Sequence, residues 1–344
     1  MMNVLNYAAA AGLTALIVYL MIVGNAILLP LVIAAFVCYL INALAAVTRD
    51  IRILGWALPS SLRLTGAIVV FLLVSWFVVS LVVRNINQVS AAVPVYQKNL
   101  QSVAERVGGR FGAYPAHFQA LFTNIDLGSM ARSLAKTVAG LVGSIGTVAV
   151  YVVFLLLEQH SLDKKIAALC TGPSREALMH QILQHIGSQI QTYVWLKTLM
   201  SVVVGIGSYL VMKIVGVDFA EFWALLIFAL NYIPYLGALF GVIFTSVLAL
   251  VQFPTLTPSL ITAGVLTVLQ FTCGSIIEPK LMGKGLNLSP VVMLLALSVW
   301  GTIWGIVGMF LAVPLMVVVM IICSHFESTR GIAVLMSADG ELRN

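Results

Sequence analysis

Ala8 to Val47 is an almost unbroken apolar stretch of about 40 residues, and it limits the possible folds more than any other part of the sequence. As an α-helix it would be about 60 Å long, roughly twice the hydrocarbon thickness of a bilayer. The stretch therefore has to turn back on itself. Gly24 and Asn25 are the expected place for the turn, because both residues tolerate turn conformations. We predict two transmembrane helices, at 8–23 and 26–47.

Four more apolar stretches are predicted spans, at 64–83, 137–157, 198–212 and 260–277. Of all residues, 61% are hydrophobic and 9% are charged, whereas soluble domains have roughly 45–50% apolar and about 25% charged residues. This composition excludes a soluble domain, whose surface would need more charge, and a disordered chain, which would be less hydrophobic. Outer-membrane barrels have alternating strands of about ten residues in place of such long runs. The sequence predicts an all-α, polytopic transmembrane helical bundle.

Two further apolar stretches, 222–253 and 291–323, are too long for one upright span and too short for two. The first is interrupted by Asn231-Tyr-Ile-Pro-Tyr-Leu-Gly237 and the second by Trp300-Gly-Thr-Ile-Trp-Gly305. Each is either a re-entrant hairpin or a long tilted helix with an unwound centre. If both stretches are hairpins that return to their own side of the membrane, the loops on the cytoplasmic side contain 11 of the 18 Lys and Arg residues. The positive-inside rule therefore favours hairpins, with both termini in the cytoplasm.

The stretch from Arg84 to Lys136 is polar, with apolar residues at helical spacing on either side of a glycine-rich break. It predicts two amphipathic helices that form a small arm outside the membrane. The predicted organisation is N-terminal transmembrane helices at 1–83, the amphipathic arm at 84–136, a fourth span with a cytoplasmic amphipathic segment at 137–197, a transport core at 198–325 and a cytoplasmic tail at 326–344.

The formal net charge of +6 does not indicate nucleic-acid binding, because the basic residues form no concentrated stripe with interleaved aromatics. Basic loops that face anionic membrane lipid explain the charge better. The sequence has no GxSxG, HExxH or phosphate-binding GxxxxGK[ST] motif. The four cysteines form no CxxC pair, and His180 and His185 are expected to be solvated loop residues. We therefore expect no enzymatic activity, no cofactor and no metal site.

A helix break at membrane depth is tolerated only where the freed backbone faces protein or water, so it marks a candidate solute site. Asn231 can donate and accept hydrogen bonds, Pro234 removes a backbone donor and frees an upstream carbonyl, and Gly237 allows close backbone approach. The alternative is a structural kink whose Asn satisfies its own helix end. Solute binding is preferred, because a simple kink would not require a costly polar side chain.

Gln270 is a further candidate solute-binding residue, and Glu278 is the candidate coupling residue at the end of the same span. Their spacing of eight places them on roughly the same helix side. Glu278 either binds a cation or proton, or pairs with Lys280 or Lys284 at the membrane interface. Pro279 and the basic residues beyond it favour the interfacial pairing.

Gly301, Gly305 and Gly308 have the small-residue spacing that permits close helix packing or a tight hairpin turn. Packing is the commoner role of such a pattern, and Gly301 and Gly305 are also candidate gating residues. Trp300 and Trp304 are expected to be interfacial anchors or to line a cavity.

Four motifs go beyond composition: Ile27-Leu-Leu-Pro-Leu31, Phe228-Ala-Leu-Asn-Tyr-Ile-Pro-Tyr-Leu-Gly237, Ile277-Glu-Pro-Lys-Leu-Met-Gly-Lys-Gly-Leu286 and Gly305-Ile-Val-Gly-Met-Phe-Leu-Ala-Val-Pro314. Through them the chain resembles, over essentially its whole length, the autoinducer-2 exporter family of bacterial inner-membrane transporters. The resemblance implies a homopentamer in which each subunit has its own path, with an elevator-like movement of the half that contains the hairpins. It also places the following residues on the family's most recognisable segments, with Pro279 and Gly283 as coupling or gating residues: Asn231, Pro234, Gln270, Glu278, Pro279 and Gly283.

The leading hypothesis is a gradient-driven or passive exporter of autoinducer-2, a small hydroxylated quorum-sensing signal. Such a solute needs hydrogen-bonding groups at bilayer depth to replace the water that it loses. The main alternative is a sodium or lithium/proton antiporter that uses Glu278 as its membrane carboxylate. A third hypothesis is a membrane scaffold without transport, which the broken helices argue against.

Overall fold

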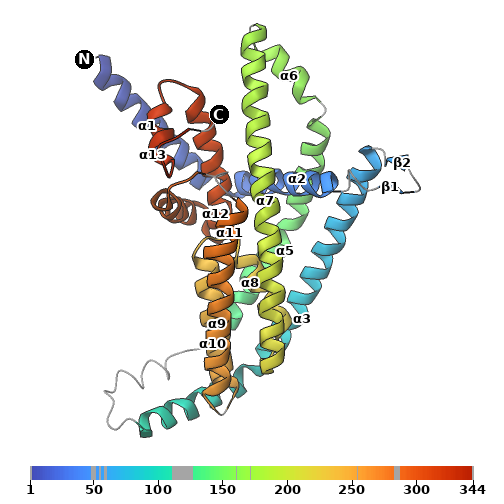
Figure 1. Ribbon diagram of the computed structural model, residues 1–344, viewed down its shortest axis with the longest axis vertical. Coiled ribbons are helices and arrows are strands. Elements are labelled where there is room, and N and C mark those ends of the chain that lie inside the picture. Colours follow the sequence, from blue (N-terminus) through green and yellow to red (C-terminus); the bar gives the residue numbers. More distant parts are fainter. Residues whose placement is uncertain are drawn as a thin grey trace. The chain divides into compact units, whose positions relative to one another are not determined.

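A computed structural model of the chain describes residues 2–47, 52–53, 56–57, 60–110, 127–159, 161–170, 172–253, 255–282 and 287–342. The predicted all-α class is confirmed, because nearly all of these residues are helical (Figure 1). Two short strands, β1 (Arg52–Ile53) and β2 (Trp56–Ala57), pair antiparallel. Five helical segments are long and apolar enough to cross a membrane: Asn25–Ala45, Leu62–Asn85, Pro173–Val215, Thr257–Leu281 and Pro290–His325. The protein is a multi-pass membrane protein.

The chain divides into two compact units that alternate along the sequence. The first unit contains Met1–Ala67, Ser144–Trp195 and Met282–Asn344, and the second contains Ile68–Gly143 and Leu196–Leu281. Each unit contains one of the two breaks that the sequence predicts, at Asn231–Tyr235 in the second unit and at Trp304–Gly305 in the first.

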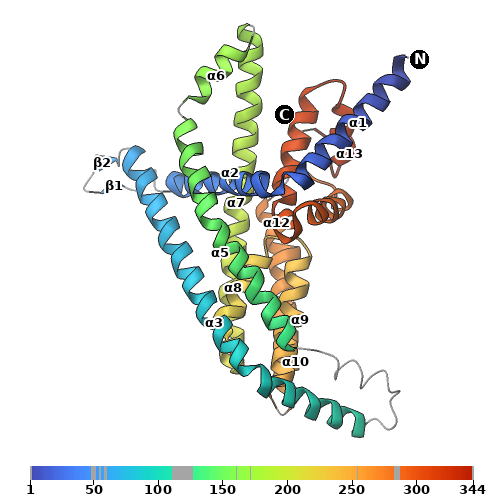
Figure 2. The same cartoon turned by 180° about the vertical axis from the view of Figure 1, so that it is seen from behind.

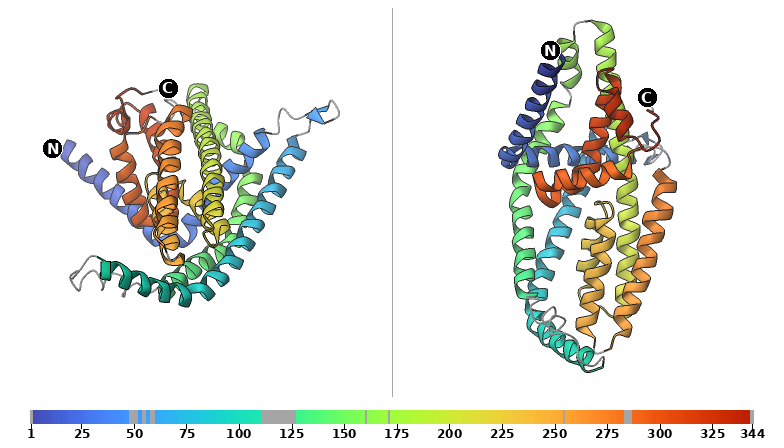
Figure 3. Two further views of the ribbon diagram at one scale, coloured as in Figure 1. Left: turned by 60° about the horizontal axis from the view of Figure 1, so that its bottom comes forward. Right: turned by 90° about the vertical axis from the view of Figure 1, so that its left-hand side faces the viewer.

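In the first unit, the N-terminal apolar stretch forms α1 (Met2–Val23) and α2 (Asn25–Val47), which meet at an angle (Figure 3). The turn lies at Gly24, as predicted, and the N–H of Gly24 still donates to the carbonyl of Leu20. Both helices are apolar on all sides, which is typical of helices surrounded by lipid and protein.

The core of the first unit joins α2, the N-terminal half of α7 (Pro173–Val215), α12 (Pro290–His325) and α13 (Arg330–Met336). Its buried apolar side chains include Phe36, Ile186, Leu311 and Met336. Phe36 and Phe310 meet edge to face, with ring centroids 5.3 Å apart. This arrangement is one of the two that aromatic pairs prefer.

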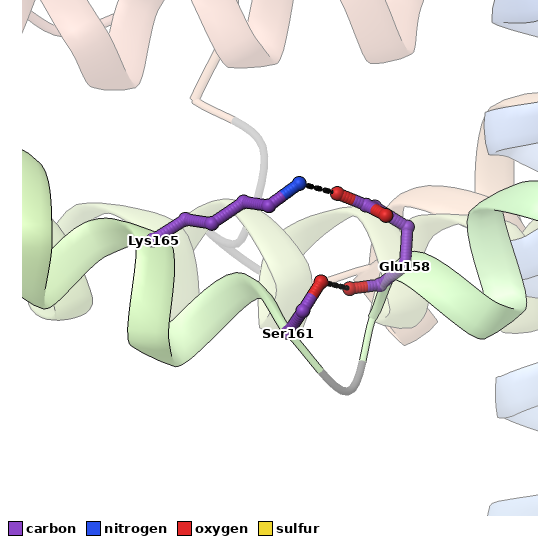
Figure 4. A network of polar contacts seen from close by, with 3 residues as sticks. All are labelled: Glu158, Ser161 and Lys165. Carbon is purple, nitrogen blue, oxygen red and sulfur yellow. Dashed lines mark hydrogen bonds and ion pairs between the residues drawn. The ribbon is translucent and has the colours of Figure 1, made fainter.

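A polar turn joins α5 (Leu127–Glu158) to α6 (Leu162–Leu169) in the first unit. The hydroxyl of Ser161 donates to the carbonyl of Glu158 at 2.9 Å, and the ammonium of Lys165 pairs with the Glu158 carboxylate (Figure 4). The hydrogen bond satisfies a carbonyl that the end of α5 leaves open. The exposed ion pair contributes little to stability.

Besides residues from 68–143, the second unit contains the C-terminal half of α7 and the helices that follow it: α8 (Ala220–Leu230), α9 (Leu236–Gln252), α10 (Thr257–Phe271), the π-helix η2 (Thr272–Ile277) and α11 (Glu278–Met282). α9 packs against both α8 and α10, and α9 and α10 lie side by side (Figures 1 and 3). The core of this unit includes Met200, Val204, Met212 and Ile227.

Three expected boundaries lie inside continuous helices. α3 (Ser60–Arg110) continues from the predicted span through position 83 into the predicted arm, α5 continues from the predicted arm through 136 into the fourth span, and α7 continues through 197. None of these boundaries has a proline or glycine at the expected end of the helix, so the helical hydrogen bonding continues. The C-terminal part of α3 bends (Figure 2), and Pro94 inside the helix removes one of its backbone bonds. The position of the arm outside the membrane stays a prediction.

Candidate functional site

The break between α8 and α9 is built from short-range hydrogen bonds. Pro234 cannot donate, and the carbonyl of Leu230 instead accepts the N–H of Ile233 at 2.9 Å. The N–H of Leu236 donates to the carbonyl of Pro234 at 2.7 Å, around Tyr235 with φ 63° and ψ −45°. This is the γ-turn with positive φ, which is rare and strained for a residue that has a side chain. The expected free carbonyl is therefore paired within the break.

Gly237 is the first point at which the returning helix meets the end of α8. A Cβ on Gly237 would lie 2.1 Å from the carbonyl oxygen of Leu230 and 2.8 Å from the Cα of Asn231. Only a glycine allows this approach. Gly237 thus allows the close approach of two segments of the protein's own backbone, and the chain turns back here as a hairpin.

The side chains of the break point toward α7. Asn231, which is 9% exposed, donates from Nδ2 to the hydroxyl of Ser201 at 3.1 Å. The next residue, Tyr232, shares a hydrogen bond of 2.6 Å with the hydroxyl of Thr198. Hydrogen bonds in a low-dielectric core replace the water that these groups lose on burial. The break therefore presents two polar pairs on one stretch of α7.

Glu278 forms a buried ion pair with a residue that sequence reasoning missed. Lys197 Nζ donates to Glu278 Oε1 at 2.6 Å, and the two side chains are only 5% and 17% exposed. Of the two interfacial partners expected for Glu278, Lys280 is exposed and Lys284 lies outside the described residues. The predicted cytoplasmic amphipathic segment ends at Lys197, and in the structure this residue is buried within α7.

One sequence signal could have found Lys197. It stands in Trp195-Leu-Lys-Thr-Leu-Met200, where an apolar run begins without a helix-breaking residue. A lysine that continues directly into a hydrophobic helix needs a partner or a route to water. Ser201 follows Lys197 by one helical turn, so the lysine shares the α7 face that meets the break.

The π-helix η2 positions Glu278. In a regular α-helix, eight residues would turn Glu278 about 80° away from Gln270. The wider turns of η2 use more residues per turn and reduce this angle. Pro279, the second residue of α11, cannot donate to the carbonyl of Ser275 within η2. The widened turn accommodates this missing bond.

Gln270 is buried in the same unit but against a different helix. It is 6% exposed, and its Nε2 lies 3.4 Å from the position that a Cβ on Gly241 of α9 would take. Among the residues that the structure describes, Nε2 has no hydrogen-bond partner. An unpaired buried amide costs free energy, and it is available to a polar solute.

The second break belongs to the first unit. In α12, Trp304 (φ −128°, ψ 16°) and Gly305 (φ 62°, ψ −144°) leave the helical conformation. Trp300 and Trp304 are buried with ring centroids 5.2 Å apart, and the indole of Trp304 donates to the carbonyl of Met21 at 3.2 Å. The two tryptophans therefore pack inside the protein, whereas interfacial or cavity-lining roles were expected.

The remaining candidates are placed as follows. A Cβ on Gly301 would lie 3.0 Å from Met309, so this glycine lies in the contact between the two arms of the second hairpin. Gly283 lies outside the described residues. His180 and His185 lie on helix α7 and not in a loop, and the ring of His185 is 6.2 Å from that of His325. Within the described ranges, no three His, Cys, Asp or Glu side chains come together as a metal site.

The cluster at the first break combines an ion pair, one pair of hydroxyl groups and one amide–hydroxyl pair in the core of a membrane protein. We call this cluster the polar core: Lys197, Thr198, Ser201, Asn231, Tyr232 and Glu278. Its groups can exchange hydrogen bonds with a polar solute. Polar and charged groups inside a membrane protein are costly and mark solute or ion pathways.

Comparison with known proteins gives a family and several relatives. The model described as "AI-2E family transporter" matches residues 12–328. The AI-2 transport protein TqsA of Escherichia coli (strain K12) is 28% identical over 319 residues, which cover 90% of this chain and 89% of that protein. A putative transport protein of Borreliella burgdorferi is 30% identical over 254 residues, covering 73% and 70%. A putative transport protein of Haemophilus influenzae is 26% identical over 349 residues, covering 98% of each.

Proposed function

Because the chain belongs to the AI-2E family of transporters, we propose that it exports autoinducer-2, a small hydroxylated quorum-sensing signal. The relatives are named as transport proteins, and this protein is a transporter and not an enzyme. One observation carries the proposal for a polar solute: Asn231 and Ser201 form a buried hydrogen bond where the α8–α9 hairpin breaks. A scaffold protein has no need for a strained helix break lined with polar groups.

The proposed solute fits the chemistry of the polar core. A hydroxylated molecule loses several hydrogen bonds to water when it enters the membrane, and each loss has to be replaced. The amide of Asn231 and the hydroxyls of Thr198 and Tyr232 supply donors and acceptors, and the unpaired amide of Gln270 in the same unit adds another donor. The hydrogen-bonded pairs of the polar core close the site in the absence of solute, and the solute replaces them when it binds.

The proposal includes a mechanism and a location. Export is passive or driven by a gradient, because the sequence has no phosphate-binding motif for nucleotide hydrolysis. We place the protein in the bacterial inner membrane as a homopentamer, with both termini in the cytoplasm. The division into two compact units, each with one helix break, supports an elevator-like movement.

A second candidate is sodium or lithium/proton antiport, and the buried Glu278 carboxylate favours it. A carboxylate inside a membrane protein is the minimum requirement for exchanging protons and cations. However, the ammonium of Lys197 lies 2.6 Å from this carboxylate and takes the place of a cation. Antiport would require a cation to displace Lys197, so this candidate ranks second.

One flux experiment separates these functions. Purified protein in proteoliposomes is given a sodium gradient while autoinducer-2 and internal pH are followed together. Saturable movement of autoinducer-2 without a sodium-dependent pH change is expected. A sodium-dependent pH change without autoinducer-2 movement would favour antiport, and no flux of either kind would favour a scaffold.

The variant Asn231→Ala tests the site itself. It removes the hydrogen bond to Ser201, and we expect it to reduce autoinducer-2 flux without loss of assembly. The matched control is Asn42→Ala, which removes a hydrogen bond of 3.5 Å to Gln159 in the first unit. Normal flux in Asn231→Ala would remove this residue from the site.

A further inference from the structure

One ion pair sets the charge of the polar core. The side chain of Lys197 is buried, that of Glu278 is 17% exposed, and their charged atoms lie 2.6 Å apart. Leaving either charge buried alone is strongly unfavourable, because the missing partner no longer offsets the loss of water. With both residues charged, the polar core has no net charge.

The other charged residues between Lys197 and Glu278 in the sequence do not belong to the polar core. Between 198 and 277 the sequence has three charged residues, Lys213, Asp218 and Glu221. Lys213 lies 3.7 Å from Glu221 with both side chains exposed, and Asp218 accepts a hydrogen bond from Tyr96 at 2.7 Å. Along α7, Lys213 is about 24 Å from Lys197. These residues therefore do not compensate a charge in the polar core.

We propose that Lys197 and Glu278 make the transport site selective for uncharged, hydroxyl-bearing solutes. A solute that carries a charge of either sign leaves one uncompensated charge in the membrane interior, whereas a neutral solute keeps the balance. The hydroxyls of Thr198 and Ser201, on the same stretch of α7, supply hydrogen bonds to such a solute. This inference rests on the proposed transport function and defines the class of its solute.

Removing one charge is expected to change selectivity in a direction that depends on which charge is lost. Glu278→Gln leaves the Lys197 ammonium alone, and an anionic solute then restores neutrality. Lys197→Met leaves the Glu278 carboxylate alone, and a cation restores neutrality. A purely structural ion pair would produce no such opposite changes, only a loss of folded protein.

The test measures three probes in proteoliposomes: autoinducer-2 as the neutral solute, erythronate as a hydroxylated anion and radioactive sodium as a cation. The wild-type protein is expected to move autoinducer-2 only. Because a charge of the wrong sign is strongly disfavoured, each single variant should gain at least about tenfold in uptake of its matching ion. Glu278→Gln should gain erythronate uptake, and Lys197→Met should gain sodium uptake.

Two variants serve as controls. The double variant Lys197→Met with Glu278→Gln removes both charges, so it should keep the preference for autoinducer-2 even if its flux is lower. Lys213→Met removes a charge from the same helix outside the polar core, and it should keep the wild-type behaviour. Gel filtration and thermal melting in detergent establish that each variant is folded.

The outcomes separate the inference from the proposed function. If the wild type moves none of the probes, the proposed function fails. If the wild type moves autoinducer-2 but the single variants keep the same preference, only the inference on charge fails. If the single variants do not fold, competition in the wild type decides: inhibition of autoinducer-2 efflux by a tenfold excess of erythronate or sodium overturns the inference, and no inhibition supports it.

Discussion

Gly308 lies against the carbonyl of Trp300, so close that a Cβ on Gly308 would be 1.9 Å from the carbonyl oxygen. The second arm of the α12 hairpin thus rests directly on the backbone of the first. The atom in the way is backbone and cannot move aside as a flexible side chain would. The same relationship holds at the first break between Gly237 and Leu230, at 2.1 Å.

We therefore predict that Gly308→Ala opens the hairpin of α12. Forcing a methyl group into this contact should destabilise the protein by about 3 kcal/mol or more. Thermal melting in detergent measures the effect. Gly146→Ala, in a part of α5 with nothing within 4 Å of the new Cβ, should be neutral or slightly stabilising. Equal melting temperatures for the two variants would contradict the close approach.

Tyr235 provides a second prediction, because its backbone is strained and its side chain is 56% exposed. Tyr235→Gly and Tyr235→Ala both remove the ring, and only glycine accepts the positive φ without cost. The glycine variant should be more stable by about 1–2 kcal/mol, the opposite of the order in an ordinary helix. Melting temperatures of the two variants measure the difference. A more stable alanine variant would show that the γ-turn is absent.

The sequence predicts those features that depend on local residue types. Gly24 and the segment from Asn231 to Gly237 mark a turn and a break because glycine, asparagine and proline interrupt helices where they stand. The continuity of α3 and α7 was not predicted, because a fall in hydropathy ends a membrane span but does not end a helix. Helices outside the membrane still satisfy their own backbone bonds.

The candidate site was predicted only in part, for a different reason. Asn231, Gln270 and Glu278 stand out because each is polar within or next to an apolar run. The pairing of these residues does not stand out, since the contact between Lys197 and Glu278 joins residues 81 positions apart. A single sequence contains no signal for such a pairing. Ser201 and Thr198 were missed as well, because small hydroxyl residues are common in membrane helices.

Tyr96 gives a prediction on the predicted arm. Its hydroxyl donates to the carboxylate of Asp218 at 2.7 Å, and its ring packs with Val251. Tyr96→Phe removes this charge-assisted bond, so it should lower stability by about 1.5–3 kcal/mol. Hydrogen exchange of the backbone from 92 to 100 should rise in the variant. Unchanged exchange would mean that this bond does not hold α3 in place.

The same bond should depend on pH. Burial and, next, the hydrogen bond to Asp218 raise the pKa of Tyr96, so the folded protein favours the neutral phenol. The neutral phenol of Tyr96 therefore stabilises the folded protein below the unfolded pKa of about 10. This stabilisation is lost as the pH rises above that value. The difference in melting temperature between wild type and Tyr96→Phe should therefore be constant from about pH 6 to 9 and shrink above about pH 10. If the difference in melting temperature already shrinks at neutral pH, its pH dependence comes from another group.

Asn287 gives the last prediction, because it ties the C-terminal residues to the segment before α12. Its Nδ2 donates to Asp339 Oδ1 and to the carbonyl of Glu341, both at 2.7 Å, and its backbone has φ 36°. Asparagine tolerates positive φ better than other residues with a side chain. Asn287→Ala loses both hydrogen bonds and also the tolerance of a positive φ, whereas Asn287→Gly loses only the hydrogen bonds.

Cleavage near the C-terminus by carboxypeptidase should accelerate in both variants, since both release Asp339. Thermal stability should fall further in the alanine variant, by about 1 kcal/mol. Wild-type cleavage rates in both variants would show that these two hydrogen bonds do not hold the C-terminal residues.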